Sequence, residues 1–362
     1  MTNTENTPRR SALVVGGTGI SGSALTRELV AQGWQTTSLS RRQAVSQPGV
    51  ETVRADLADT QAVQEALSGL DPTHVFFTAW SRRPTEAENI TVNAAMVRNV
   101  LDTTGPSGNL QHVALVTGLK HYLGPFEAYG TEATRDTPFH EDEPRLETPN
   151  FYYAQEDELW QAADAYGFDW SVHRSHTMIG HALGNAMNLG QTLAAQAALC
   201  RAEGAPFIFP GNETQWNGVT DMTDSSLLAR QMIWAATTPG LPSQAYNTAN
   251  GDVFRWRWMW PRIAQLLGVE PEGYADRPRP LEDQMAGKDD LWRELVESED
   301  LAEPELARVA SWWHTDGDLN RPVECFTDMT RSRSAGFTDY ANTLDSFATL
   351  FETLRREHVI PA

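Results

Sequence analysis

Cysteine is nearly absent from this 362-residue sequence, and lysine is equally rare, with two of each. Cys200 and Cys325 are too few for a disulfide framework or a cysteine-rich metal site, so we expect both to be ordinary core residues. Histidine offers no metal site either, because His173 and His176 have no carboxylates nearby at a ligating spacing. We therefore expect no bound metal.

Positive charge is also scarce, with 28 lysines and arginines against 48 aspartates and glutamates and a formal net charge of −20. Such a field repels nucleic acid and anionic membranes, which argues against either as a partner. No apolar stretch approaches membrane-spanning length, and the opening MTNTENTPRR lacks the apolar run of a secretory signal. We expect a cytoplasmic protein with a flexible leader over residues 1–10.

The residues that are present, 40% hydrophobic and 21% charged, are those of a folded globular protein longer than one hydrophobic core usually occupies. Apolar β-forming runs alternate with stretches of helical periodicity, which predicts an α/β fold with a Rossmann-type doubly wound parallel sheet. A nucleotide-binding domain is predicted over 11–185, with later strands near 206–252 interleaved, and a mostly helical substrate-covering portion over 186–362. The clearest predicted strands are 11–17, 35–40, 50–57, 74–80 and 112–118, and helices are expected at 18–34, 91–104 and 151–165.

A glycine motif joins the first predicted strand to the first predicted helix. Gly16, Gly19 and Gly22 form G-x-x-G-x-x-G, with Thr18 and Ile20 between them. Glycine is needed where a chain turns tightly and where backbone approaches a pyrophosphate, which then lies at the positive end of the helix. The alternative is a tight turn without a ligand, but the strand and helix around the motif favour a dinucleotide site.

The end of the second predicted strand carries Ser40, Arg41 and Arg42, where NAD-binding proteins place an acidic residue that holds the ribose 2′-hydroxyl. Guanidinium groups instead bind a 2′-phosphate through paired hydrogen bonds, so this position favours NADPH over NADH. The alternative is a solvated pair of surface arginines.

Further cofactor contacts are expected where other predicted strands end. Asp56 and Leu57 follow the third strand and are candidates for the adenine edge, although Asp56 would serve equally as a helix cap. The other candidates are Thr78, Ala79 and Trp80 at the end of the fourth strand, together with Thr117 and Ile179.

The catalytic residues are harder to place, because the Tyr-x-x-x-Lys pair usual in hydride transfer on this fold is missing. Four residues after Tyr152 and Tyr153 stand Glu156 and Asp157, and a carboxylate would oppose phenolate character in the tyrosine. Lys120 lies just beyond the strand at 112–118, at the edge of the sheet where active sites of this architecture form. Lys120 and Tyr152 could therefore converge. An aromatic that anchors a helix is the alternative role, and the residues alone do not choose between Tyr152 and Tyr153.

Several motifs together resemble the progesterone 5β-reductase/iridoid synthase-like branch of the short-chain dehydrogenases. They are GGTGISG, SRR, TGLKHYLGPFE, NFYYAQEDEL, DWSVHR, YNTANGDVFRW and SWWHTD, and the resemblance runs from about Ser11 to the C-terminus. It implies NADPH-dependent reduction of a C=C bond conjugated to a carbonyl, with Lys120 and Tyr152 catalytic. Hydride would reach the β-carbon, the Tyr152 hydroxyl would stabilise the enolate, and Lys120 would keep Tyr152 acidic and orient the nicotinamide ribose.

One departure concerns the segment after DWSVHR, where Ser175 stands in place of the proline of plant-like members, so we expect a shifted loop there. Substrate-pocket candidates are His121, Tyr122, Phe337 and Phe347. The expected substrate is a small apolar compound with a conjugated carbonyl, and steroids, monoterpene dialdehydes and small enones all stay open.

Other functions and the assembly state also stay open at this point. A 1,2-carbonyl reductase and a catalytically silent NADPH-binding regulator are the alternatives, whereas an epimerase should keep the Tyr-x-x-x-Lys pair. A homodimer is one expected assembly, because paired subunits are common among oligomers.

Overall fold

The computed structural model describes residues 10–41, 48–125, 128–129 and 135–362. The predicted leader, apart from Arg10, lies outside these residues, as does Arg42. The chain forms two compact units. The first comprises Met1–Gly124, Pro144–Arg174 and Leu228–Tyr246, and the second comprises Pro125–Glu143, Ser175–Leu227 and Asn247–Ala362.

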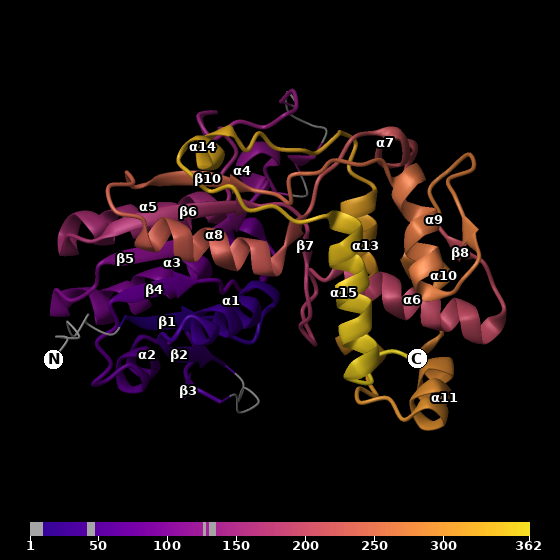
Figure 1. Cartoon of the computed structure of the whole chain (residues 1–362), viewed down its shortest axis with the longest axis horizontal. Coiled ribbons are helices and arrows are strands. Elements are labelled where there is room, and N and C mark those ends of the chain that lie inside the picture. Colours follow the sequence, from indigo (N-terminus) through magenta and orange to yellow (C-terminus); the bar gives the residue numbers. More distant parts are fainter. Residues whose placement is uncertain (1–9, 42–47, 126–127, 130–134) are drawn as a thin grey trace, which may run out of the picture. The chain divides into compact units, whose positions relative to one another are not determined.

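The first unit is built around the predicted parallel sheet, which has seven strands in the order β10-β6-β5-β4-β1-β2-β3 (Figure 1). The order reverses beside β1, which pairs in parallel with both β2 and β4. In open α/β sheets this reversal is where ligands bind. The strands are β1 (Ser11–Val15), β2 (Gln35–Ser40), β3 (Val50–Arg54), β4 (His74–Phe77), β5 (His112–Gly118), β6 (Asp169–Ser175) and β10 (Gln244–Thr248).

Helices cover this sheet because its central strands are apolar on both faces, as in β4, where every residue is buried. The pattern predicted from sequence is confirmed, and local signals set the helix ends. Thr85 and Glu88 form a capping box at the start of α3, and Gly167 ends α5 with φ of 76°. The helices are α1 (Ile20–Ala31), α2 (Thr60–Ala66), α3 (Glu86–Thr104), α4 (Lys120–Leu123), α5 (Phe151–Tyr166) and α8 (Ser225–Thr237).

Three buried histidines lie side by side on β4, β5 and β6, namely His74, His112 and His173. The Ser171 hydroxyl joins His112 Nε2 to His173 Nε2 at 2.9 Å each, and His173 Nδ1 lies 2.9 Å from Gln231 Oε1. Burial lowers the pKa of His74 and of His173 to about 4 and that of His112 to about 3. All three are therefore neutral imidazoles at neutral pH.

These imidazoles should make the protein sensitive to acid. An unfolded histidine has a pKa of about 6.5, so between pH 6.5 and 4 the unfolded state binds more protons and stability falls as pH falls. We expect His173→Gln, which retains hydrogen-bonding capacity but does not titrate, to reduce this loss by roughly 3 kcal/mol. Urea unfolding at pH 7.5, 5.5 and 4.5 measures the loss of unfolding free energy, and His140→Gln, at an exposed histidine, is the control. Equal losses in both variants and the parent would contradict the expectation.

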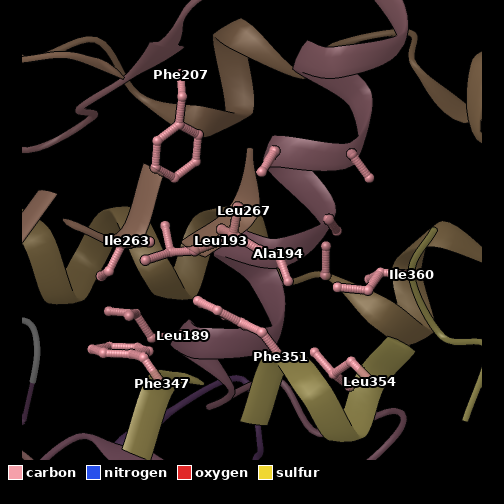
Figure 2. Close-up of a cluster of buried hydrophobic side chains, with 14 of the residues drawn as sticks. Leu189, Leu193, Ala194, Phe207, Ile263, Leu267, Phe347, Phe351, Leu354 and Ile360 are labelled. Carbon is pink, nitrogen blue, oxygen red and sulfur yellow. The ribbon is translucent and has the colours of Figure 1, made fainter. Parts of the chain in front are cut away.

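The second unit has its own core and is mostly helical, as is the portion over 186–362 that the sequence predicts to be so. Leu189 and Leu193 of α6, Ile263 of α9 and Phe347 and Phe351 of α15 meet there (Figure 2). Its helices are α6 (Leu189–Glu203), α7 (Glu213–Asn217), α9 (Trp256–Leu267), α10 (Leu281–Gln284), α11 (Asp289–Glu299), α12 (Leu306–Val309), α13 (Trp312–Leu319), α14 (Thr330–Ser334) and α15 (Thr343–Arg356). Two short sheets pair β7 (Met178–Ile179) with β9 (Thr223–Asp224), and β8 (Phe207–Ile208) with β11 (Pro271–Glu272).

The aromatic and basic segment FRWRWMW begins helix α9. Trp256 and Trp260, four residues apart, lie on one face and are fully buried, whereas Trp258 is 45% exposed beneath the Arg262 guanidinium. Cys200 and Cys325 are both buried, as expected of core residues. In the part of the chain that the structure describes, no helix has the length and apolarity needed to cross a membrane.

Candidate active site

The glycine motif forms a tight loop between β1 and α1. Gly16 has φ of +90°, and its N–H donates to Leu39 O at 2.8 Å. A Cβ on Gly22 would lie 2.2 Å from Gly16 O, and one on Gly17 would lie 2.0 Å from Ser38 Oγ. Gly16, by its backbone conformation, and Gly22, by its contact with backbone, therefore require glycine, whereas a Cβ on Gly17 would meet the Ser38 side chain. Gly17 was not among the predicted site residues, although it lies inside the same tight turn.

The same loop contacts the end of β4. The Thr78 hydroxyl donates to Val15 O at 2.8 Å, and a Cβ on Gly16 would lie 3.0 Å from both Thr78 Oγ1 and Ala79 Cα. The structure thus brings these predicted cofactor residues together beside β1, where the strand order reverses. Trp80 follows and stacks on Phe151, the first residue of α5, with ring centroids 5.7 Å apart.

The ends of β2 and β3 also carry predicted cofactor residues. Ser40 is buried at the end of β2, and Arg41 is exposed directly after it. Asp56 does not cap a helix, because Asp59 is the N-cap of α2 and Asp56 Oδ1 accepts from Ala58 N at 3.1 Å. The helix-cap alternative for Asp56 is therefore wrong. Leu57 is buried.

Lys120 is the first residue of α4 and Tyr152 is the second residue of α5, and a hydrogen bond joins the starts of the two helices. Asn150, the N-cap of α5, accepts hydrogen bonds from Tyr152 N and Tyr153 N, and its amide donates to Lys120 O at 3.3 Å. Lys120 Nζ lies 5.0 Å from the centroid of the Phe151 ring, and the Tyr152 ring lies 4.4 Å from the same ring, centroid to centroid. Lys120 and Tyr152, which are distant in sequence, therefore both contact the Phe151 ring.

Tyr153 has a different environment from Tyr152. Tyr153 is buried, its hydroxyl donates to His121 O at 2.7 Å, and it accepts from Leu146 N at 2.9 Å. These two bonds join α4, α5 and the segment before α5, so Tyr153 has a structural role. Tyr152, in contrast, is half-buried.

The carboxylates that replace the expected lysine are neutralised by arginines. Arg145 Nη2 lies 2.9 Å from Glu156 Oε2, and Arg145 Nη1 lies 2.7 Å from Asp157 Oδ1. Arg174 Nη2 lies 3.9 Å from Glu156 Oε1. Burial raises the pKa of Glu156, and the two arginines oppose that rise.

The remaining site candidates lie in buried positions. The His121 ring meets Tyr122 and Tyr153 edge to face, with centroids 4.9 and 5.4 Å away. Thr117 is buried in β5, and Ile179 is buried in β7 of the second unit. Phe337 and Phe347 are buried in the second unit, Phe347 within its core, so their part in a substrate lid stays a prediction.

The segment that follows Ser175 is held by buried polar groups of the second unit. His176 Nδ1 lies 2.7 Å from Asp221 Oδ1, and His176 Nε2 accepts from Arg321 Nη1 at 2.6 Å. The Arg321 guanidinium also donates to Thr177 Oγ1 at 3.3 Å. These bonds fix the segment without proline's restriction on φ.

Among the described residues no group of three or more His, Cys, Asp or Glu is arranged to hold a metal.

Solved structures share the fold at low identity. A UDP-glucose 4-epimerase from Thermus thermophilus, in complex with NAD, is 17% identical with a TM-score of 0.67, covering 95% of this chain and 99% of that one. A UDP-glucose 4-epimerase from Thermotoga maritima, with UDP-glucose, is 15% identical with a TM-score of 0.69, covering 96% and 99%. This likeness confirms the Rossmann-type fold.

Sequence relatives are much closer. A 3-oxo-Δ4,5-steroid 5β-reductase from Arabidopsis thaliana and an (S)-8-oxocitronellyl enol synthase from Camptotheca acuminata are each 36% identical over 364 residues, 97% of this chain and 93% of theirs. The family described as the PRISE-like Rossmann-fold domain matches residues 26–361. The resemblance seen in the motifs is confirmed, and the chain belongs to the PRISE family.

Proposed function

We propose that this protein is an NADPH-dependent reductase of the C=C bond of enones or enals. The observation that carries the proposal is the convergence of Lys120 and Tyr152 on the Phe151 ring. Tyr153 is already engaged in two hydrogen bonds, which favours Tyr152 as the group that meets the substrate. The names of the relatives, a steroid 5β-reductase and enol synthases, support the same chemistry.

The glycine loop suits a dinucleotide. Gly16 and Gly22 lie where added side chains would collide with backbone, so the loop can accept a pyrophosphate at close range, before the N-terminus of α1. Arg41, exposed directly after β2, would bind a 2′-phosphate. Thr78, Ala79 and Trp80 would line the same site. Bound NADPH supplies the hydride.

The chain's own residues then handle the charge that develops on the substrate. When hydride adds to the β-carbon, negative charge moves to the carbonyl oxygen, and a Tyr152 hydroxyl hydrogen bond stabilises that enolate. The Lys120 cation favours phenolate character in Tyr152 and so strengthens the hydrogen bond. The α-carbon then takes its proton from solvent.

Cofactor preference tests the role of Arg41. We expect Arg41→Ala to raise KM for NADPH by about 10- to 100-fold, as the loss of a charge-assisted hydrogen bond would, and to leave KM for NADH unchanged. Steady-state kinetics with both cofactors measure this, and the double variant Arg41→Ala/Arg42→Ala tests the pair. Arg27→Ala, exposed on α1, is the matched control. An unchanged NADPH/NADH ratio in the double variant would refute the 2′-phosphate assignment.

The reaction itself is tested by following NADPH oxidation with 2-cyclohexenone, progesterone, citral and matched saturated carbonyl compounds. Products are identified by mass spectrometry and NMR. Saturated C=C products are the expected result. Alcohols as the sole products would move the function to 1,2-carbonyl reduction, and NADPH binding without turnover would indicate a silent regulator.

A further inference from the structure

A partly buried cluster of charged side chains in the first unit has no role in the mechanism given above. It consists of Glu156 and Asp157 on α5, Arg145 before that helix and Arg174 on β6. Glu156 is fully buried and Arg174 is 5% exposed. Isolated charges are costly to bury, so a cluster like this one is retained in a fold only when its members compensate one another.

Each arginine of the cluster contacts a tyrosine, Arg174 contacting Tyr122 of α4 and Arg145 contacting Tyr153 of α5. Arg174 Nη1 donates to the Tyr122 hydroxyl at 3.3 Å, and its guanidinium lies 5.5 Å from the Tyr122 ring centroid. Arg145 donates to Tyr153 O at 3.2 Å, and its guanidinium lies 4.8 Å from the Tyr153 ring centroid. The cluster therefore contacts Tyr122 of α4 directly and Tyr153 of the neighbouring helix α5.

Tyr153 extends the connection to the residue after Lys120, because its hydroxyl donates to His121 O at 2.7 Å. Helix α4 comprises only four residues, Lys120–Leu123, and a single turn has too few hydrogen bonds of its own to hold its orientation. Its orientation must come from tertiary contacts, and two of these lead to the cluster, one directly from Tyr122 to Arg174 and one from His121 through Tyr153 to Arg145.

We propose that Glu156 is a positioning residue for Lys120, acting by holding Arg145 and Arg174 against Tyr153 and Tyr122. In a Tyr-x-x-x-Lys protein the helix places the lysine one turn beyond the tyrosine. Here that position on α5 holds Glu156, and the lysine comes from a separate segment that has to be fixed in another way. This inference rests on the proposed function, whose catalytic lysine it explains.

Because the chain has only two lysines, the accessibility of the Lys120 amine can be measured directly. Lys120 and Lys288 are the two lysines of the chain, so labelling of their amines by an N-hydroxysuccinimide ester, read by mass spectrometry, reports each separately. We expect Glu156→Gln and Arg174→Met to speed labelling of Lys120 severalfold, because its helix loosens, while Lys288 is labelled at the parent rate. Arg174→Lys, which keeps the charge beside Glu156, should restore part of the parent behaviour.

Kinetics supply the second readout. Glu156→Gln and Arg174→Met should lower kcat for enone reduction by about 10- to 100-fold, as displacement of a catalytic group does, while KM for NADPH stays within about threefold. The matched control is Glu158→Gln on the same helix, which removes a carboxylate paired with Arg98. It should change neither kcat nor the labelling of Lys120.

The outcomes are distinguishable. If the variants lose thermal stability but keep parent kcat and parent labelling of Lys120, the cluster is merely structural and the inference is overturned. If parent protein reduces no enone, the proposed function fails, and labelling of Lys120 still decides whether Glu156 positions it. Faster labelling in Glu158→Gln as well would also overturn the inference, since the effect would then be general to α5.

Discussion

Tyr152→Phe lowers kcat for enone reduction by about 100- to 1,000-fold, the usual cost of removing one donor to a developing oxyanion. Tyr153→Phe, which removes one of the bonds that orient α4, should lower kcat by about tenfold at most and should also lower the melting temperature. The Tyr153 hydroxyl bonds to His121 O and Leu146 N, so its removal takes one hydrogen bond from each of these two backbone groups. Steady-state kinetics and thermal unfolding of both variants separate the two roles.

The pair of tyrosines provides its own control, because the two variants remove the same atom from neighbouring residues. The assignment of Tyr152 is wrong if Tyr152→Phe keeps full turnover while Tyr153→Phe is folded and inactive. Measuring NADPH affinity in both variants shows whether any loss of activity arises in cofactor binding instead. We expect that affinity to stay near the parent value in Tyr152→Phe.

Gly22→Ala should abolish useful cofactor binding, with affinity for NADPH reduced by about 100-fold or more. The added methyl would lie 2.2 Å from Gly16 O and 2.9 Å from Gly17 Cα, and neither backbone atom can move without opening the loop. Overpacking of this kind also lowers the free energy of unfolding by about 1–3 kcal/mol. Fluorescence titration with NADPH and urea unfolding measure the two effects.

The neighbouring residue supplies the comparison for this test. Ser23→Ala adds no atom, and it removes one hydroxyl oxygen from a half-buried residue of α1, where that hydroxyl donates to Ile20 O at 3.3 Å. It should bind NADPH as the parent does. A Gly22→Ala protein that binds NADPH within threefold of the parent would show that the glycine loop is not the pyrophosphate site.

The fold likeness to UDP-glucose 4-epimerases illustrates how little a Rossmann-type sheet decides about chemistry. Position 156, four residues beyond Tyr152, carries a carboxylate paired with Arg145. The choice between Tyr152 and Tyr153, and the segment that supplies the lysine, therefore depend on the side chains around α4 and α5. Proteins that share a strand order can differ in those side chains.

Local patterns in the sequence were sufficient to predict the parallel sheet, the glycine loop and most helices. Strands such as β4 are continuous apolar runs, and the loop at Gly16 depends on backbone conformation that only glycine adopts easily, so both signals lie within a few residues. Near Asp56 the local signal was ambiguous, because two aspartates lie close together. The hydrogen bond from Ala62 N to Asp59 decided which of them caps α2.

Residue patterns and motifs were enough to predict the fold, the glycine loop and the family. The contacts of the folded chain were needed to show that Tyr153 is an anchor, that Lys120 and Tyr152 both contact Phe151, and that Glu156 is paired with Arg174. These facts depend on contacts between segments far apart in the chain, such as Tyr153 with His121, 32 residues away. Residue patterns report local backbone preference and burial, whereas the partner of a buried polar group is fixed only when distant segments pack together.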